Sequence, residues 1–114
     1  MTREQVLAMS AQELAEATAV HVMEWRKLDP DVWIVDDEVR IRYRRSWNPA
    51  EDIRDAKALM DKLQESHLYM DIRTCSDFYE VWVTNWENDI QTQTEAHPML
   101  ERAITTCSLL AVVK

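Results

Sequence analysis

The most constraining feature of this sequence is the absence of glycine from all 114 residues. Average usage of about 7% would place roughly eight glycines in a chain of this length. Glycine adopts left-handed and other sterically restricted backbone at little cost, and several phosphate-binding and catalytic loops depend on it. The sequence therefore excludes a GxxxxGK[ST] phosphate loop, a GxGxxG dinucleotide-binding turn and a GxSxG nucleophile elbow.

Length and charge limit the class of protein further. A chain of 114 residues is suited to one domain spanning residues 1–114, and no window approaches the ~20 apolar residues that cross a bilayer. The 13 Lys+Arg and 21 Asp+Glu give a formal net charge of -8, which disfavours non-specific binding to duplex nucleic acid or to anionic lipid. The acidity has two explanations: it keeps a small domain soluble, or it imitates nucleic acid for a basic partner.

The two cysteines and the N-terminal segment indicate the compartment. Cys75 and Cys107 allow at most one intramolecular disulfide. The segment 1–7 carries charge where a secretion signal would have its apolar block. We therefore expect a cytoplasmic protein with both thiols reduced.

Apolar spacing predicts three helices, over residues 10–28, 49–65 and 98–114. Two capping-box signatures, beginning at Thr2 and Ser10, predict a short helical turn followed by the first long helix. Asp29-Pro30 is expected to end that helix. Asn48-Pro49 predicts the start of the second helix, because it supplies a capping residue followed by proline at the first helical position.

Four β-rich runs predict two hairpins, over residues 32–35 with 39–44 and over residues 68–73 with 78–83. Residues 84–94 have no apolar period and predict a mobile polar loop, in which asparagine must supply any left-handed backbone. The order α-ββ-α-ββ-α predicts an α+β fold. We expect an α/β/α sandwich with a central four-stranded antiparallel sheet covered by helices.

Several segments resemble the phage ABA sandwich domain family. Residues 15–25, AEATAVHVMEW, are similar to the family's V-A-E-x-V-M-G-W opening, with Glu24 in the place of the family glycine. Residues 52–63 are similar to its S-T-D-I-A-A-A-W-x-V-V-E-K-L helix, and residues 96–112 to its T-A-P-L-A-I-C-R-A-A-L-L-A-V end. The aromatic run 78–82 stands where the family has a W-x-V strand. The resemblance implies a protein of a bacteriophage or prophage and transfers no catalytic residue.

The segment 40–47 is the one concentrated basic feature of this acidic chain, and we take it as the leading candidate site. In the predicted strand, Val39, Ile41 and Tyr43 share one face, while Arg40, Arg42 and Arg44 share the other at a spacing of about 7 Å. This spacing suits phosphates or a row of carboxylates, and Arg45 and Trp47 extend the candidate site, with Trp47 able to stack on a base. Two alternatives stay open: the arginines pair with acids of the protein itself, or Trp47 serves as a hydrophobic staple.

The five tryptophans suggest different roles. Trp25 and Trp33 lie within apolar periods and are expected in the core. Trp86 lies among polar residues, so it is either folded back onto the sheet or exposed as an anchor for a partner. We include Trp86 among the candidate binding residues.

The sequence offers little support for catalysis or for a metal site. His21 and Glu24 are one helical turn apart, but the remaining His and Cys residues show no paired ligand spacing. A nucleophilic role for Cys75 has even less support than a metal site. Cys107 belongs to an apolar helical stripe and is expected to be a small core residue. We therefore expect no catalytic residues, no metal and no cofactor.

The sequence and the resemblance together lead to two functional hypotheses. The first is a phage-encoded accessory protein, not an enzyme, that binds a host protein stoichiometrically in the host cytoplasm and interferes with it, an antiviral defence protein such as a CRISPR effector being the expected target class. The second is a small-ligand binder that sequesters a nucleotide signal through the arginine-rich strand. A homodimer through an edge strand at 78–83 stays open, as does a place for that strand in the middle of the sheet.

Overall fold

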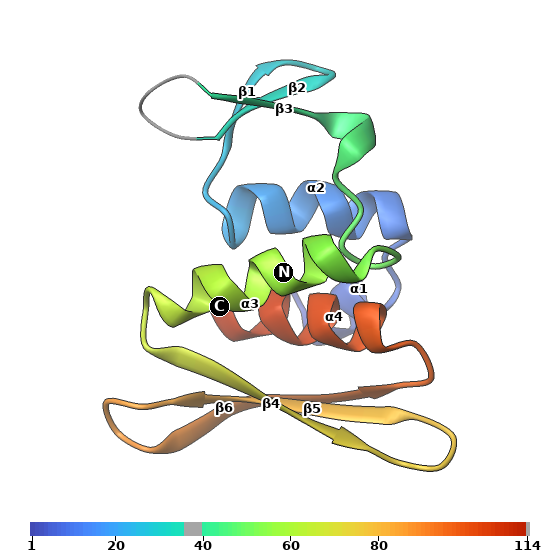
Figure 1. The fold of residues 1–114 in the computed structure, drawn as a ribbon, viewed down its shortest axis with the longest axis vertical. Helices are drawn as coiled ribbons and strands as arrows, with labels where there is room; N and C mark the ends of the chain where they lie inside the picture. Colours follow the sequence, from blue (N-terminus) through green and yellow to red (C-terminus); the bar gives the residue numbers. More distant parts are fainter. Residues whose placement is uncertain (36–39, 114) are drawn as a thin grey trace.

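A computed structural model describes residues 1–35 and 40–113 and shows an α+β fold (Figure 1). The helices are α1 Arg3–Leu7, α2 Ala11–His21, α3 Ile53–Gln64 and α4 Leu100–Val112, with a 3-10 turn at Arg44–Ser46. The strands are β1 Arg26–Asp29, β2 Val32–Ile34, β3 Ile41–Tyr43, β4 Leu68–Thr74, β5 Tyr79–Asn85 and β6 Ile90–His97.

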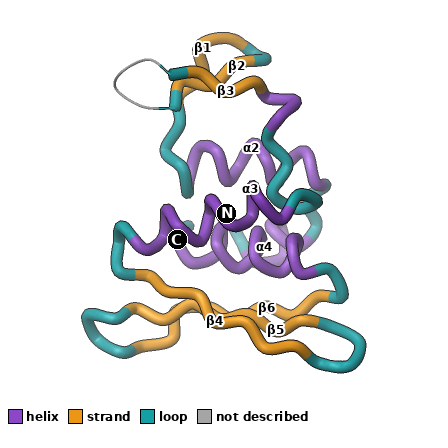
Figure 2. Tube along the Cα trace, in the orientation of Figure 1, coloured by secondary structure: helices purple, strands orange, loops and turns teal. Residues whose placement is uncertain are grey.

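The strands form two separate antiparallel sheets, which we name sheet A, with the order β1-β2-β3, and sheet B, with the order β4-β5-β6. The helices lie between the two sheets (Figure 2). The predicted single four-stranded sheet covered by outer helices is therefore wrong, although the α+β class and both hairpins are confirmed. The physical reason is that each hairpin pairs with a third strand that is its neighbour in sequence, instead of pairing with the other hairpin.

The capping boxes at the N-terminus are confirmed. The Thr2 side chain accepts a hydrogen bond from the Gln5 amide, and the Ser10 side chain accepts one from the Glu13 amide. The second long helix begins later than Asn48-Pro49 predicts, because that pair opens a turn closed by the Asp52 amide on the Asn48 carbonyl at 2.8 Å. Asp52 is the residue that caps α3.

The helix predicted over 10–28 ends at His21, and the segment 26–29 is a strand instead. Glu24 adopts φ 60, which is the left-handed conformation that ends helices. The amide of Trp25 then donates to the carbonyl of Ala19 at 2.9 Å. This helix end has no signal in the sequence, because Glu24 occupies the position where the phage ABA sandwich domain family, which the sequence resembles, has glycine.

The polar loop predicted over 84–94 is also wrong at both ends, since β5 continues through Asn85, and β6 begins at Ile90 and pairs with β5 with one irregularity in the register. The left-handed residue of the connecting turn is Asp89, with φ 58, and not an asparagine as the sequence predicted. Strand β6 has no apolar period because it is an edge strand whose first three residues are exposed, and Glu95 is its one buried residue. The strand 79–85 lies in the middle of sheet B, so a dimer formed by pairing through this strand is excluded.

The main core runs through the helical layers and joins both sheets. Trp33 contributes from sheet A, Val81 and Val83 contribute from sheet B, and Leu59 and Ile104 come from the helices between them. Trp25 and Trp33 are buried, as predicted. Within the described residues, no helix is long and apolar enough to cross a bilayer.

Candidate functional site

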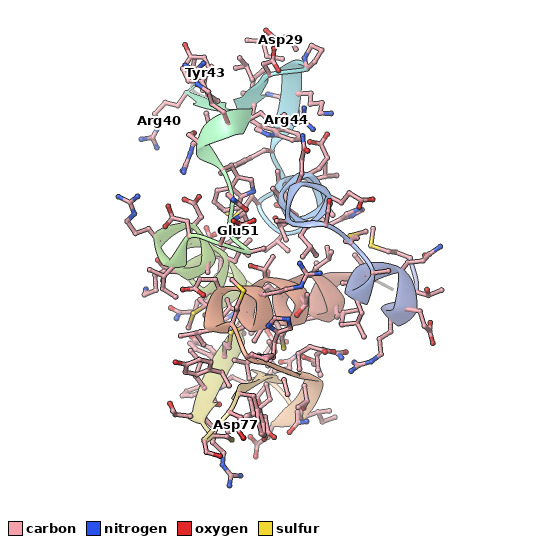
Figure 3. All side chains as sticks on the ribbon, turned by 90° about the vertical axis from the view of Figure 1, so that its right-hand side faces the viewer. Asp29, Arg40, Tyr43, Arg44, Glu51 and Asp77 are labelled. Carbon is pink, nitrogen blue, oxygen red and sulfur yellow. The ribbon has the colours of Figure 1, made fainter. Side chains whose placement is uncertain are left out.

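The arginine-rich segment does not present a continuous cationic row. Ile41 and Tyr43, which share the apolar face of the predicted strand, are 47% and 49% exposed. Arg42 is half-buried and turned inward, opposite Trp33 in the sheet register. Arg44 lies beyond the strand, in the 3-10 turn, and Figure 3 shows Arg40 and Arg44 on opposite sides of sheet A. Val39 lies outside the described residues.

Arg42 joins β3 to α3. Its Nη2 lies 2.8 Å from Oδ1 of Asp55, a buried carboxylate on α3, and the same atom donates to the Ser46 carbonyl at 2.8 Å. The other oxygen of Asp55 accepts from the Asn48 amide at 2.9 Å. The guanidinium also lies 5.3 Å from the centre of the Trp47 ring. Arg42 therefore serves as an internal structural residue, as the ion-pair alternative predicted.

Trp47 is a core residue. It is 3% exposed, and its indole Nε1 donates to the Ala15 carbonyl at 3.0 Å. Its ring meets Trp25 edge-on, with centroids 4.7 Å apart. Trp47 consequently has no free face on which a base could stack.

A cleft of about 790 Å³ lies between sheet A, the start of α2 and the turn after Trp47. Its charged lining residues are Glu16, Asp29, Asp31, Arg44, Arg45 and Glu51. Arg44 Nε lies 3.5 Å from Glu16 Oε2, and Lys27 forms an ion pair with the other oxygen of the same carboxylate. The Arg45 guanidinium lies over the Tyr43 ring at 5.1 Å. Of the predicted site residues, the cleft brings together Arg44, Arg45 and Trp47 and leaves out Arg40, Arg42 and Trp86.

A second candidate surface is the face of sheet B that points away from the helices, which we call the open face. Val81 and Val83 are fully buried on the helix side of β5, so the alternation places Glu80, Trp82 and Thr84 on the open face. The register adds their cross-strand partners, which are Tyr69, Asp71, Arg73, Gln91, Thr94 and Ala96.

Trp86 extends the open face beyond the end of β5. It is 68% exposed, and its ring packs against Tyr69 with centroids 4.6 Å apart. The sequence left open whether Trp86 folds back onto the sheet or is exposed. The structure combines the two, because the indole packs on Tyr69 of the sheet and most of its surface stays exposed. This aromatic pair was missed from sequence because Tyr69 lies on β4 and Trp86 follows β5, so the pair depends on the β4–β5 register. The available signal was the alternation of β5, which places Trp82, Thr84 and Trp86 on one face when it is continued past residue 83.

Neither cysteine lines the cleft or is one of the paired residues of the open face. Cys107 is fully buried in α4, and burial, followed by the negative charge of Glu95, raises the pKa of its thiol to about 12. Cys75 is half-buried near the β4–β5 turn. In residues 1–35 and 40–113, no three His, Cys, Asp or Glu side chains gather closely enough to hold a metal ion.

A family model described as the Phage ABA sandwich domain matches residues 16–109. The chain belongs to this family. The match to the Phage ABA sandwich domain runs from α2 through both sheets into α4, so it includes the cleft's basic residues and the open face. The family's phage association indicates a phage protein. No curated protein and no solved structure gives a significant match.

Proposed function

We propose that this phage protein acts by binding a host protein stoichiometrically, and not by catalysis, and that it interferes with antiviral defence in the host cytoplasm. The expected target class is a defence effector such as a CRISPR nuclease complex. The observation that carries the proposal is Trp86, which is 68% exposed and held against Tyr69 at the end of the open face.

An exposed, supported indole is suited to protein recognition. Tryptophan and tyrosine dominate the energetics of many interfaces because each buries a large rigid surface and loses little conformational freedom on binding. The contact with Tyr69 orients the Trp86 ring before any partner arrives, which lowers the entropic cost of association. The half-buried Trp82 widens the same surface.

The test is phage plating on a host that carries an active CRISPR system, with this protein expressed from a plasmid. We expect the wild-type protein to restore plaque formation and the Trp86→Ala variant to lose this effect. Leu28→Ala is the matched control, because Leu28 is also an exposed apolar residue, 57% exposed, but lies in sheet A. Equal restoration by the wild type and by Trp86→Ala, at equal melting temperatures, would overturn the role of the open face. No restoration by the wild type would overturn the target class.

The cleft supports a second candidate function, the sequestration of a nucleotide. A space of about 790 Å³ lined by Arg44 and Arg45 is within the usual range for small-molecule sites, and both guanidinium groups can pair with phosphate. A nucleotide that binds there should raise the melting temperature of the wild type and not that of Arg44→Ala or Arg45→Ala. No rise with any nucleotide in a panel would exclude this function.

A further inference from the structure

The open face and its two flanking turns are strongly acidic. Asp71 and Glu80 lie on the face itself, Asp77 lies in the β4–β5 turn, and Glu87 and Asp89 lie in the β5–β6 turn. Arg73 is the single Lys or Arg among residues 68–97. Figure 3 shows Asp77 at the end of the molecule opposite Asp29 of sheet A, so this charge is concentrated at the sheet B end.

These carboxylates are not used to hold the protein together. Within the described part of the chain, Asp71, Asp77, Glu80 and Asp89 form no ion pair. Glu87 has one partner, the imidazole of His67 at 3.7 Å. By contrast, Asp55 and Glu95, which are buried, both pair with arginine. Arg73, the cross-strand partner of Glu80, is the one basic residue on the open face, so the face and its flanking turns keep a surplus of carboxylates over basic groups.

The carboxylates lie beside the aromatic rings. Asp71 is the cross-strand partner of Trp82, and Glu80 is two residues away on the same face, which is about 7 Å along the strand. Glu87 directly follows Trp86. An aromatic ring next to a carboxylate attracts a guanidinium or ammonium group twice, through the ring's electron-rich face and through the ion pair.

The same charges argue against the other ligand that aromatic sheet faces bind. Sheets that stack single-stranded nucleic acid on their aromatic residues combine them with basic residues that attract the phosphates. Here the open face offers Asp71 and Glu80 against one arginine.

We propose that the open face of sheet B binds a basic patch of its partner protein, seating lysine or arginine side chains against Trp82 and Trp86 between Asp71, Glu80 and Glu87. This inference rests on the proposed function and specifies the chemistry of the partner. A basic patch of this kind is what proteins use to hold a nucleic acid backbone, so occupying it would block that binding.

The experiment follows the indole N–H signals of Trp82 and Trp86 by NMR, assigned with Trp82→Phe and Trp86→Phe. The probes are a short peptide alternating arginine or lysine with serine, the same peptide with glutamate in place of the basic residues, and an oligothymidine. We expect both signals to shift with the basic peptide alone. We also expect the affinity to fall about tenfold or more between about 50 and about 300 mM NaCl.

Two variants of equal net charge distinguish binding at the open face from binding that depends only on the overall negative charge of the protein. The first is Asp71→Asn, Glu80→Gln and Glu87→Gln together, and the second is Glu4→Gln, Glu24→Gln and Asp61→Asn together, which removes three exposed carboxylates outside both sheet B and the cleft. We expect the first to weaken peptide binding about tenfold or more and the second to change it less than about twofold.

Equal weakening by the two variants would overturn the proposal, because the binding would then depend on net charge alone. Shifts caused by the oligothymidine would also overturn it and would make the surface a nucleic-acid platform. If Trp86→Ala abolishes defence inhibition while the triple sheet B variant retains it, the proposed function stands and the basic-patch inference fails. If the triple sheet B variant loses peptide binding while Trp86→Ala still inhibits defence, the proposed function of the open face fails.

Discussion

At the scale of single residues, the lack of glycine has a measurable cost. Among the described residues, Glu24, His67 and Asp89 adopt φ of 60, 61 and 58. Each lies in a short connection that leads into a strand or joins two strands, where the chain must reverse. A residue with a Cβ is less stable in this left-handed conformation than glycine by about 1–2 kcal/mol. Turns that other chains make with glycine are therefore made here by residues under local strain.

Replacing Glu24 by glycine is expected to stabilise the protein. The relief of about 1–2 kcal/mol is partly offset by the greater freedom of glycine in the unfolded chain, about 0.5–1 kcal/mol. The net gain in the free energy of unfolding is about 1 kcal/mol, measured by urea denaturation. Glu24→Ala is the control, because it removes the same carboxylate, 3.9 Å from Lys62, without relieving the backbone. Equal stabilities for the two variants would show that position 24 carries no strain.

The two cysteines are expected to differ in reactivity. A pKa raised to about 12 by burial keeps the Cys107 thiol protonated, and a protonated thiol is a poor nucleophile. At pH 8, a thiol reagent should therefore modify one cysteine per folded chain, Cys75, and both in denaturant. Since the pKa of Cys107 is higher in the folded state than its ordinary value of 9.0, its contribution to stability should decline as the pH rises from about 9 towards about 12. Rapid modification of Cys107 in the folded chain would contradict this.

At the scale of elements, Arg42 and Asp55 connect sheet A to α3. Arg42→Ala would leave the buried Asp55 carboxylate with the Asn48 amide as its remaining partner. Because Arg42 is 35% exposed, the loss should fall below that of a fully buried pair, at about 2 kcal/mol of unfolding free energy. The measurement is chemical denaturation, with Arg45→Ala as the control, since Arg45 is exposed and contacts the ring of Tyr43. Equal losses in the two variants would refute a bracing role.

The elements that were predictable from sequence are those specified by local signals. The Ser10 and Thr2 caps and the two hairpins depend on residues a few positions apart, and all are present in the structure. Strand β1 was missed because Glu24 gives no local signal of a helix end, and β6 because an edge strand needs no apolar alternation. The two missed strands also decide the layer order, because β1 and β6 each complete a separate sheet with the hairpin next to them in sequence.

The candidate site was predictable to a smaller extent. The role of Arg42 depends on Asp55, which is 13 residues away and reaches it through the docking of α3. The alternation in 39–44 suggested an exposed arginine row, whereas the structure turns Arg42 inward and exposes Ile41 and Tyr43. Trp86 was recognised as unusual because it lies in a polar segment, but its support by Tyr69 requires the β4–β5 register.

At the scale of the whole molecule, the two sheets are attached to the helices by different forces. Sheet B buries Val81 and Val83 completely. Sheet A contributes one buried side chain, Trp33, and all four residues of β1 are exposed. Val35, which follows β2, adds a partly buried apolar contact, and ion pairs join Lys27 of β1 and Arg44 of the 3-10 turn to Glu16 and Arg42 of β3 to Asp55. Apolar burial holds sheet B, whereas sheet A depends to a larger extent on ion pairs that salt can screen.

This difference predicts that sheet A opens locally while sheet B stays folded. Hydrogen exchange measured by mass spectrometry should show faster exchange in β1 and β2 than in β5, because local opening of sheet A exposes less apolar surface. Raising NaCl from about 50 to about 500 mM should speed exchange in sheet A and leave β5 unchanged, since screening weakens the pairs of Glu16. Glu16→Gln should reproduce the effect at low salt. Exchange rates that rise together in both sheets would indicate one cooperative unit and would refute this division. If sheet A alone responds, the cleft beneath it can open without disturbing the open face of sheet B, so the two candidate sites can be altered independently.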